Sequence, residues 1–145
     1  MAVTGNKSNY YKEKVANLAL GNQAYTPPTG IFLALFLSAI NHSATGGYPG
    51  EVTGAGYSRF SAANGLGAGQ WITALTASGT GYKYNAADWT FPTARSLWGT
   101  VDYFAVVDAA TNGNILYWGQ LATAKVVASG DVFRFPSGAL VITEV

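Results

Sequence analysis

The segment formed by residues 98–120 constrains the fold more than any other part of the sequence. Residues 101–108 are apolar at nearly every step, which predicts a strand that is covered on both faces. The Asn112-Gly113 pair that follows predicts a tight turn, because both residue types tolerate a positive φ. Residues 115–118 then return with aliphatic and aromatic side chains on both faces. This pattern predicts a β-hairpin at the centre of an all-β core.

Further short segments with strand character follow one another along the chain, separated by glycine and proline turns. They are residues 31–38, 57–62, 70–75, 88–91, 122–127, 132–135 and 139–143. Segment 31–38 contains leucine and alanine, but its length and its flanking prolines and glycines favour a strand over a helix. Strands of this length and spacing predict one domain over residues 1–145, an antiparallel β-sandwich of jelly-roll type.

The N-terminal region, residues 1–22, predicts an arm followed by one short helix. Residues 1–7 are polar and contain glycine, so we expect a loose arm. Ser8 is a good N-cap, and Gly21-Asn22 is a stop signal. An apolar stripe at helical spacing lies between them, formed by Tyr11, Val15 and Leu18. We expect the helix to pack across one end of the β core, with docking onto a neighbouring subunit as the alternative.

The composition excludes several classes of partner. Charged residues make up only 10% of the chain and the net charge is +1, which gives no electrostatic basis for binding nucleic acid. The longest apolar run, residues 31–40, is too short for a membrane helix, and residues 1–8 lack a secretory signal, so we expect synthesis in a cytosol. Cysteine is absent. So few charges are typical of a surface that is largely covered by other subunits.

No motif in the sequence predicts catalysis, a cofactor or a metal. His42, the single histidine, stands beside Ser43 in a loop, but adjacent residues in an extended loop point apart. The glycine-rich segment 64–69 lacks the lysine and the helix of a phosphate-binding loop. Asp108 and Asn114 predict hydrogen bonds to turn amides more strongly than calcium ligation. We expect no enzyme, although a pair of carboxylates could still assemble in space.

The aromatic residues divide into core and contact candidates. Four tryptophans stand in apolar strand contexts, so we expect most of them in the core: Trp71, Trp89, Trp98 and Trp118. Residues in the N-terminal segment and in two loops are more exposed by pattern, and they are our candidates for contact with a partner. These are Asn9, Tyr10, Tyr11, Tyr48, Tyr82 and Tyr84.

Several segments, in order over most of the chain, resemble small bacteriophage virion proteins that are described as tail-fibre-like proteins or as capsid decoration (cement) proteins. The matching pieces are AYTPP (24–28) before IFLALF (31–36), EVTGAGYSR (51–59), WTFP (89–92), WGTV (98–101), DAAT (108–111) before LYWG (116–119), and SGD (129–131) before FPSGAL (135–140). Residues 63–85 depart from the resemblance, since they are longer and richer in tyrosine and tryptophan than the relatives.

The resemblance implies a structural role in a virion, for a protein made in the host cytoplasm. Our first hypothesis is a capsid decoration protein that bridges the subunits of the shell. Its partners would be the major capsid protein and itself, in a homo-oligomer with a trimer as the expected form, because a shell has local threefold positions. A tail or tail-fibre component is the structural alternative. A carbohydrate-binding module that uses exposed aromatic residues is an alternative of another class.

Overall fold

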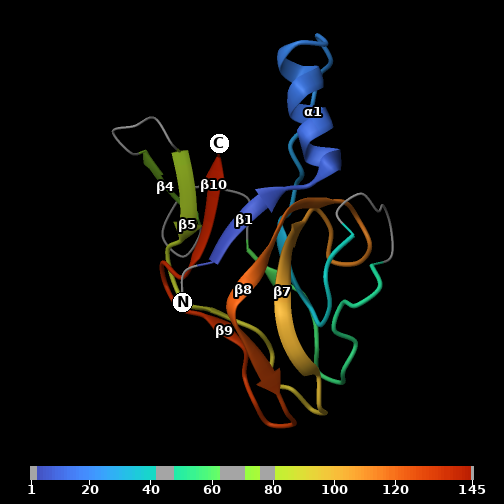
Figure 1. The fold of residues 1–145 in the computed structure, drawn as a ribbon, viewed down its shortest axis with the longest axis vertical. Coiled ribbons are helices and arrows are strands. Elements are labelled where there is room, and N and C mark those ends of the chain that lie inside the picture. The colour runs from blue at the N-terminus through green and yellow to red at the C-terminus, as the bar shows by residue number, and fades with distance from the viewer. Residues whose placement is uncertain (1–2, 42–47, 63–70, 76–80, 145) are drawn as a thin grey trace.

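The computed structural model describes residues 3–41, 48–62, 71–75 and 81–144 of the 145-residue chain. Its elements are β1 (Val3–Lys7), α1 (Asn9–Ala19), β2 (Phe32–Phe36), β3 (Phe60–Ser61), β4 (Trp71–Leu75), β5 (Gly81–Asn85), β6 (Trp89–Thr90), β7 (Gly99–Val107), β8 (Ile115–Val127), β9 (Arg134–Phe135) and β10 (Leu140–Glu144). Figure 1 shows a body of strands from which α1 projects. The prediction of a mostly antiparallel β fold with one short helix is confirmed.

The described strands form one large sheet and one small sheet. The large sheet has eight strands in the order β3-β2-β7-β8-β1-β10-β5-β4, and β6 pairs with β9 in the small one. Side chains from both sheets meet in the main core, which includes Leu35 from β2, Phe104 from β7, Trp89 from β6 and Phe135 from β9. The small sheet therefore covers one face of the large sheet, an arrangement that fits the expected sandwich.

The central hairpin is confirmed, and it is longer than the sequence indicates. Strand β7 pairs with β8 from Gly99↔Val127 to Val107↔Ile115. The turn between them has Asn112 at φ 52° and Gly113 at φ 77°, the positive values that the pair was expected to tolerate. We predicted two strands, 115–118 and 122–127, but β7 also pairs with Gly119 and Gln120 and, after a shift in register, with Lys125–Val127, so β8 is one irregular strand.

The hairpin is also covered on both faces, as predicted. The main core lies on one face, and a second cluster lies on the other, where residues 40 and 48 cover the sheet. This second cluster consists of Ala34, Phe36, Ile40, Tyr48, Ala105, Val107 and Ile115. Of the four tryptophans, Trp71, Trp89 and Trp98 are buried, whereas Trp118 is partly exposed.

The expectation of a loose arm over residues 1–7 is wrong from Val3 onward. Strand β1 pairs in parallel with β10, from Val3↔Leu140 to Gly5↔Ile142, and then antiparallel with β8 at Asn6↔Trp118 and Lys7↔Tyr117. It therefore joins the two halves of the large sheet. In its sequence, VTGNK, Val3 and Thr4 favour a strand, but Gly5, Asn6 and Lys7 do not. The strand forms because two partners more than a hundred residues away supply its backbone hydrogen bonds. Pairing over such a distance cannot be predicted from a local sequence pattern.

Ser8 joins β1, α1 and β8. Its hydroxyl accepts a hydrogen bond from the backbone N–H of Tyr11 at 3.1 Å, which confirms the predicted N-cap. The same hydroxyl donates to the carbonyl of Ile115, and the backbone N–H of Ser8 donates to the carbonyl of Leu116 at 2.8 Å. Ser8 is fully buried. At the other end of α1, Asn22 has φ 51°, which confirms the stop signal.

Replacing Ser8 by alanine should lower the free energy of unfolding by about 2 kcal/mol, because the variant loses a helix cap and leaves a buried carbonyl without its donor. Urea unfolding followed by circular dichroism measures this difference. Ser58→Ala is the matched control, since Ser58 is exposed, and its expected effect is within about 0.5 kcal/mol. Equal unfolding midpoints for the two variants would contradict the role given to Ser8.

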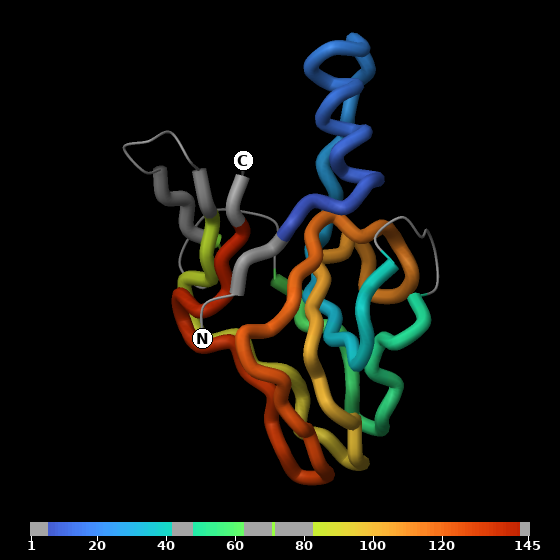
Figure 2. The backbone as a smooth tube through the Cα atoms, viewed as in Figure 1, coloured from blue at the N-terminus to red at the C-terminus, as the bar shows by residue number. Residues whose placement is uncertain are grey.

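The expected packing of α1 across the end of the β core is wrong. The helix has no buried residue, and it stands clear of the sheets (Figure 1). Figure 2 shows the chain after the helix returning beside it toward β2. We call α1 together with residues 20–31 the helical hairpin. At the first turn of α1, the ring of Tyr11 lies 5.2 Å from that of Tyr117 on the body and 6.0 Å from that of Tyr25 within the hairpin, centre to centre. At the other end of the hairpin, Ile31 packs against the main core.

Candidate functional site

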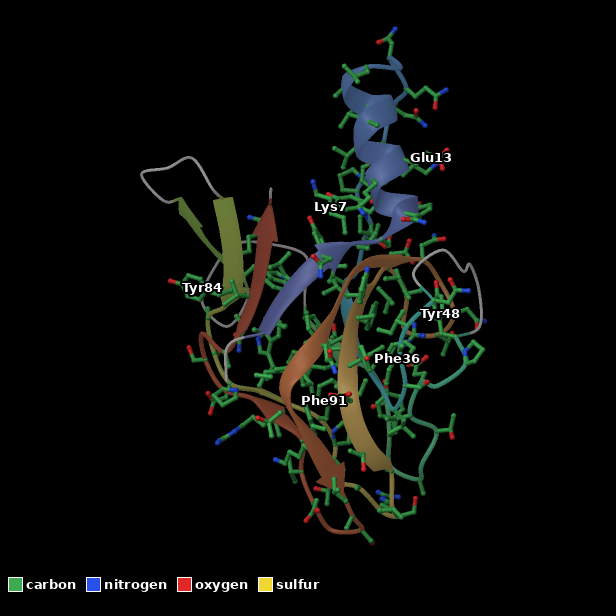
Figure 3. The ribbon with its side chains drawn as sticks, in the orientation of Figure 1. Lys7, Glu13, Phe36, Tyr48, Tyr84 and Phe91 are labelled. Carbon is green, nitrogen blue, oxygen red and sulfur yellow. The ribbon has the colours of Figure 1, made fainter. Side chains whose placement is uncertain are left out.

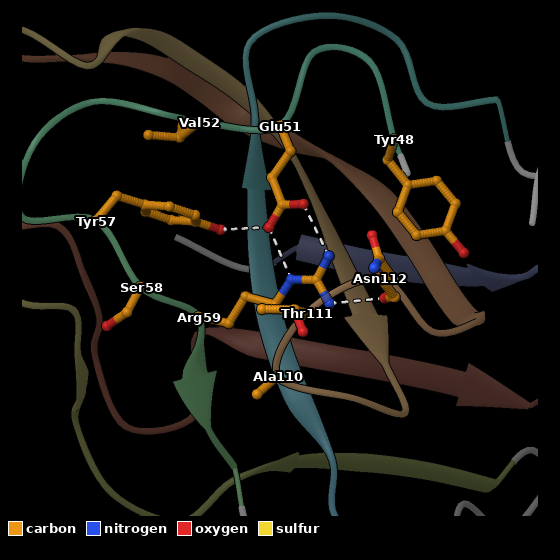
Figure 4. A pocket seen from close by; sticks show the side chains of 9 residues that line it. All are labelled: Tyr48, Glu51, Val52, Tyr57, Ser58, Arg59, Ala110, Thr111 and Asn112. Carbon is orange, nitrogen blue, oxygen red and sulfur yellow. Dashed lines mark hydrogen bonds and ion pairs between the residues drawn. The ribbon is translucent and has the colours of Figure 1, made fainter. Parts of the chain in front are cut away.

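A cavity of about 370 Å³ lies beside the turn of the central hairpin, and Figure 4 shows the residues around it. Two backbone hydrogen bonds hold one wall of the cavity along β2: Leu37 donates to Gly50 at 2.8 Å, and Val52 donates to Leu35 at 2.9 Å. The other wall is the β7–β8 turn. The lining residues are Tyr48, Glu51, Val52, Tyr57, Ser58, Arg59, Ala110, Thr111 and Asn112.

An ion pair between Glu51 and Arg59 lies at the centre of this region. Nε of Arg59 lies 2.7 Å from Oε1 of Glu51 and Nη2 lies 2.8 Å from Oε2, which is a bidentate arrangement. The Arg59 side chain is only 4% exposed, and the Glu51 side chain is 16% exposed. Nη1 of Arg59 donates to the carbonyls of Ala109 and Asn112, at 2.8 Å each. The guanidinium therefore ties the Glu51 segment to the turn of the central hairpin.

Tyr57 completes the environment of the carboxylate. Its hydroxyl donates to Oε1 of Glu51 at 3.0 Å and accepts from the backbone N–H of Leu35 at 3.0 Å. Burial, followed by the charge of Glu51, raises the pKa of Tyr57. Burial alone would lower the pKa of Arg59, but its hydrogen bonds with Glu51 and the charge of that carboxylate outweigh burial and raise it. Both groups therefore keep one protonation state near neutral pH.

Tyr48 holds the same turn from the other side. Its hydroxyl donates to the carbonyl of Gly113 at 2.6 Å, and its ring packs against Phe36 with 6.3 Å between ring centres. We call Tyr48, Glu51, Tyr57 and Arg59 the turn brace. Because three donors already engage the Glu51 carboxylate, its arrangement is that of a structural support and not of a general base.

The turn is also closed from within by Asp108. Its Oδ1 accepts from the backbone N–H of Asn114 at 2.6 Å, and its Oδ2 accepts from the Asn114 side chain at 3.0 Å. The prediction that these residues bond to turn amides is confirmed. Within the described ranges, no three histidine, cysteine, aspartate or glutamate side chains gather in a way that could hold a metal ion.

The structure separates the predicted contact residues into three places. Asn9 is exposed, and Tyr10 and Tyr11 are half-buried, all three at the base of α1. Tyr48 is only 9% exposed, so its expected exposure is wrong: its ring fills the second core cluster and its hydroxyl binds the turn. Figure 3 shows Tyr48 and Tyr84 at opposite sides of the body. The sugar-binding alternative thereby loses one of its exposed aromatic rings.

The remaining predicted residues lie on or near β5. Tyr84 is half-buried, and its backbone pairs with Val141 of β10. The backbone of Tyr82 pairs with Thr143 and Ala74, while its side chain lies outside the described parts. His42 and the glycine-rich segment 64–69 also lie outside the described residues. Contact of the six residues with a partner stays a prediction.

Sequence reasoning did not identify the turn brace. Glu51 and Arg59 stand eight residues apart in a glycine-rich loop, where no periodicity links them. One signal was available: the chain has only seven acidic and eight basic residues, so a glutamate and an arginine within one short segment are unusual here. Sequence reasoning also did not identify Tyr25, which lies against Tyr11 at the base of the helical hairpin. Burial, then Tyr11, Tyr10 and Asp108, raise the pKa of Tyr25 to about 12.

The helical hairpin presents apolar side chains to solvent at its tip. Leu18 is 54% exposed and Leu20 is 89% exposed. Near its base, Nζ of Lys14 lies 5.4 Å from the centre of the Tyr10 ring. None of the described helices has the length and the apolar composition needed to span a membrane.

The comparison with known families agrees with this structural character. A family model described as Podophage GP4 fiber I protein gp80 matches residues 6–143, a range that includes the helical hairpin, the turn brace and nearly all of the strands. No curated protein matches the chain. The resemblance to phage virion structural proteins is thereby confirmed. The chain belongs to the podophage GP4 fiber I protein gp80 family, and it is a structural protein of the bacteriophage virion.

Proposed function

We propose that this protein is a subunit of a phage tail fibre, with a structural and not an enzymatic role, and that it is held in the virion by non-covalent contacts. The family description favours this alternative over the capsid decoration hypothesis, which it does not mention. The observation that carries the proposal is the helical hairpin, which stands clear of a braced and well-packed β body.

The helical hairpin has the properties of an attachment element. A helix of 11 residues is marginally stable alone in water, and most helices in proteins depend on tertiary packing. Here α1 buries none of its residues in its own chain. Covering Leu18 and Leu20 in a partner would contribute about 1.5–3 kcal/mol for each side chain. The proposed partners are neighbouring virion proteins and further copies of this chain.

The copy number and the position of the protein in purified particles test this proposal. Quantitative mass spectrometry against the major capsid protein should give a ratio far below one, and immunogold labelling should decorate the tail. A ratio near one-to-one with label over the shell would instead support a decoration protein. Native mass spectrometry of the purified protein measures the proposed self-association, for which the trimer remains the expected form.

Replacing Leu18 and Leu20 together by serine should reduce incorporation into particles by a factor of at least about ten, since a loss of about 1.4 kcal/mol of docking energy, less than one leucine contributes, already has that effect. Phage that lack the gene would be complemented with each variant, and the incorporated protein would be quantified. The unfolding midpoint should stay unchanged, because neither leucine is buried.

Leu97→Ser is the matched control for the double variant. Leu97 is 65% exposed but lies next to β7, on the body and not on the helical hairpin. Its substitution should leave incorporation unchanged. Equal incorporation of the double variant and the control would exclude the helical hairpin as the attachment element. The assignment to a fibre would not be affected by that result, because immunogold labelling and copy number test it separately.

A further inference from the structure

The Asn112-Gly113 pair lies at the exposed end of the central hairpin, and its two potentially reactive groups have no hydrogen-bond partner among the described residues. The Asn112 side chain is exposed, and its amide makes no hydrogen bond to any residue that the structure describes. The backbone nitrogen of Gly113 likewise donates to no described acceptor. Gly113 has no Cβ to hinder approach to its nitrogen. An asparagine followed by glycine in this condition is chemically able to deamidate.

The reaction needs only water and a solvent base. The Gly113 nitrogen gives up its proton and attacks Cγ of Asn112, forming the new N–Cγ bond of a five-membered succinimide. The bond between Cγ and Nδ2 breaks, and the amide nitrogen leaves as ammonia with the transferred proton. One water molecule then opens the ring at either carbonyl, which gives aspartate or isoaspartate. Nothing is oxidised or reduced.

The turn brace opposes the geometry that this reaction requires. A φ of 52° places Asn112 in the left-handed region, where ψ is about 30–60°. Ring closure requires the Asn112-Gly113 peptide unit to rotate about the Cα–C bond of Asn112, so that the Gly113 nitrogen comes to the side of Cγ. The carbonyl of Asn112 and the nitrogen of Gly113 belong to the same planar unit. Because Nη1 of Arg59 holds that carbonyl at 2.8 Å, the nitrogen cannot rotate unless this hydrogen bond opens.

The next peptide unit is held as well. The Tyr48 hydroxyl donates to the carbonyl of Gly113 at 2.6 Å, and Asp108 binds the backbone N–H of Asn114 at 2.6 Å. The Asn112-Gly113 unit is therefore fixed at its own carbonyl and at the residues that follow. We propose that Asn112 is a deamidation site whose rate is set by the opening of the turn brace, so that the folded protein is protected at this position. A virion protein is not replaced after release, which makes such protection valuable.

Peptide mass spectrometry of the purified protein, incubated in mildly alkaline buffer, tests the proposal by measuring aspartate and isoaspartate at position 112. Folded wild-type protein should react at least about tenfold more slowly than protein unfolded in urea. Tyr48→Phe removes one hydroxyl and should speed the reaction in folded protein about two- to tenfold. This is the factor by which the loss of one hydrogen bond raises the equilibrium constant for opening of the turn brace. Tyr84→Phe, at a half-buried tyrosine on the opposite side of the body from Tyr48 (Figure 3), should leave the rate unchanged.

Arg59→Lys provides a second variant, because lysine keeps the positive charge beside Glu51 but cannot also hold the two turn carbonyls in the same geometry. Circular dichroism establishes that each variant is folded under the incubation conditions. In the sample unfolded in urea, Asn64, which also precedes glycine, reports that the conditions support deamidation. Equal rates at Asn112 in folded and unfolded protein would overturn the proposal, as would wild-type rates in both folded brace variants.

Discussion

Replacing Arg59 by alanine is expected to lower the free energy of unfolding by about 3–5 kcal/mol, the usual cost of removing one partner from a buried ion pair. The variant would leave the Glu51 carboxylate largely buried, and of its donors among the described residues only the Tyr57 hydroxyl would remain. It would also release the carbonyls of Ala109 and Asn112 from their donor. Urea unfolding monitored by tryptophan fluorescence measures the loss.

Another ion pair among the described residues offers a matched control. Arg134 binds Asp88 at 3.1 Å, but the two side chains are 53% and 50% exposed. Arg134→Ala should therefore cost at most about 1 kcal/mol, as is usual for a pair in solvent. Replacing Glu51 and Arg59 together by leucine should cost less than Arg59→Ala, since no charge remains buried. If Arg59→Ala costs no more than Arg134→Ala, the turn brace does not stabilise the protein.

Phe91→Ala is expected to lower the free energy of unfolding by about 3–5 kcal/mol, because it opens a cavity at the centre of the aromatic core. Phe91 is 1% exposed and follows β6, where the small sheet packs on the large one. Ring centres of its neighbours lie 5.8 to 6.5 Å away, at Tyr57, Phe60, Phe133 and Phe135. The same urea experiment measures the change.

Two further variants show whether the loss arises from the cavity. Phe91→Leu keeps most of the apolar volume and should cost about 1.5 kcal/mol or less. Leu97→Ala removes apolar atoms from a side chain that is 65% exposed, so its effect should stay within about 0.5 kcal/mol. A loss for Phe91→Ala close to that of Leu97→Ala would mean that the core closes around the missing ring.

The structural features of this protein differ in how far the sequence determines them. The Ser8 cap, the stop at Asn22 and the Asn112-Gly113 turn were all predictable, because each depends on the backbone preferences of one or two neighbouring residues. The central hairpin was predictable because a short connection that contains Asn112-Gly113 joins two apolar segments that are adjacent in sequence. The all-β class follows from the same local signals repeated along the chain.

The turn brace could not be predicted in this way. Glu51 and Arg59 are close in sequence, but the turn that they brace lies some fifty residues later. Tyr57 joins them by donating to Glu51, and it also accepts a hydrogen bond from a strand some twenty residues earlier. An ion pair in a glycine-rich loop is indistinguishable from two solvated charges until burial is known. Tyr48 illustrates the same point, since its loop composition indicated exposure and its position beneath the turn made it part of the core.

The N-terminal region shows most clearly which features the local sequence determines and which depend on tertiary contacts. The sequence by itself determined that a helix would begin after Ser8 and end before Asn22, because capping and stop signals act within one turn of a helix. Only the tertiary structure decided that Val3–Lys7 is a strand, because both of its partners lie in the last third of the chain. The tertiary structure also decided that α1 stands away from the body. An apolar stripe indicates that one face of a helix can be buried, but it does not indicate which surface covers that face.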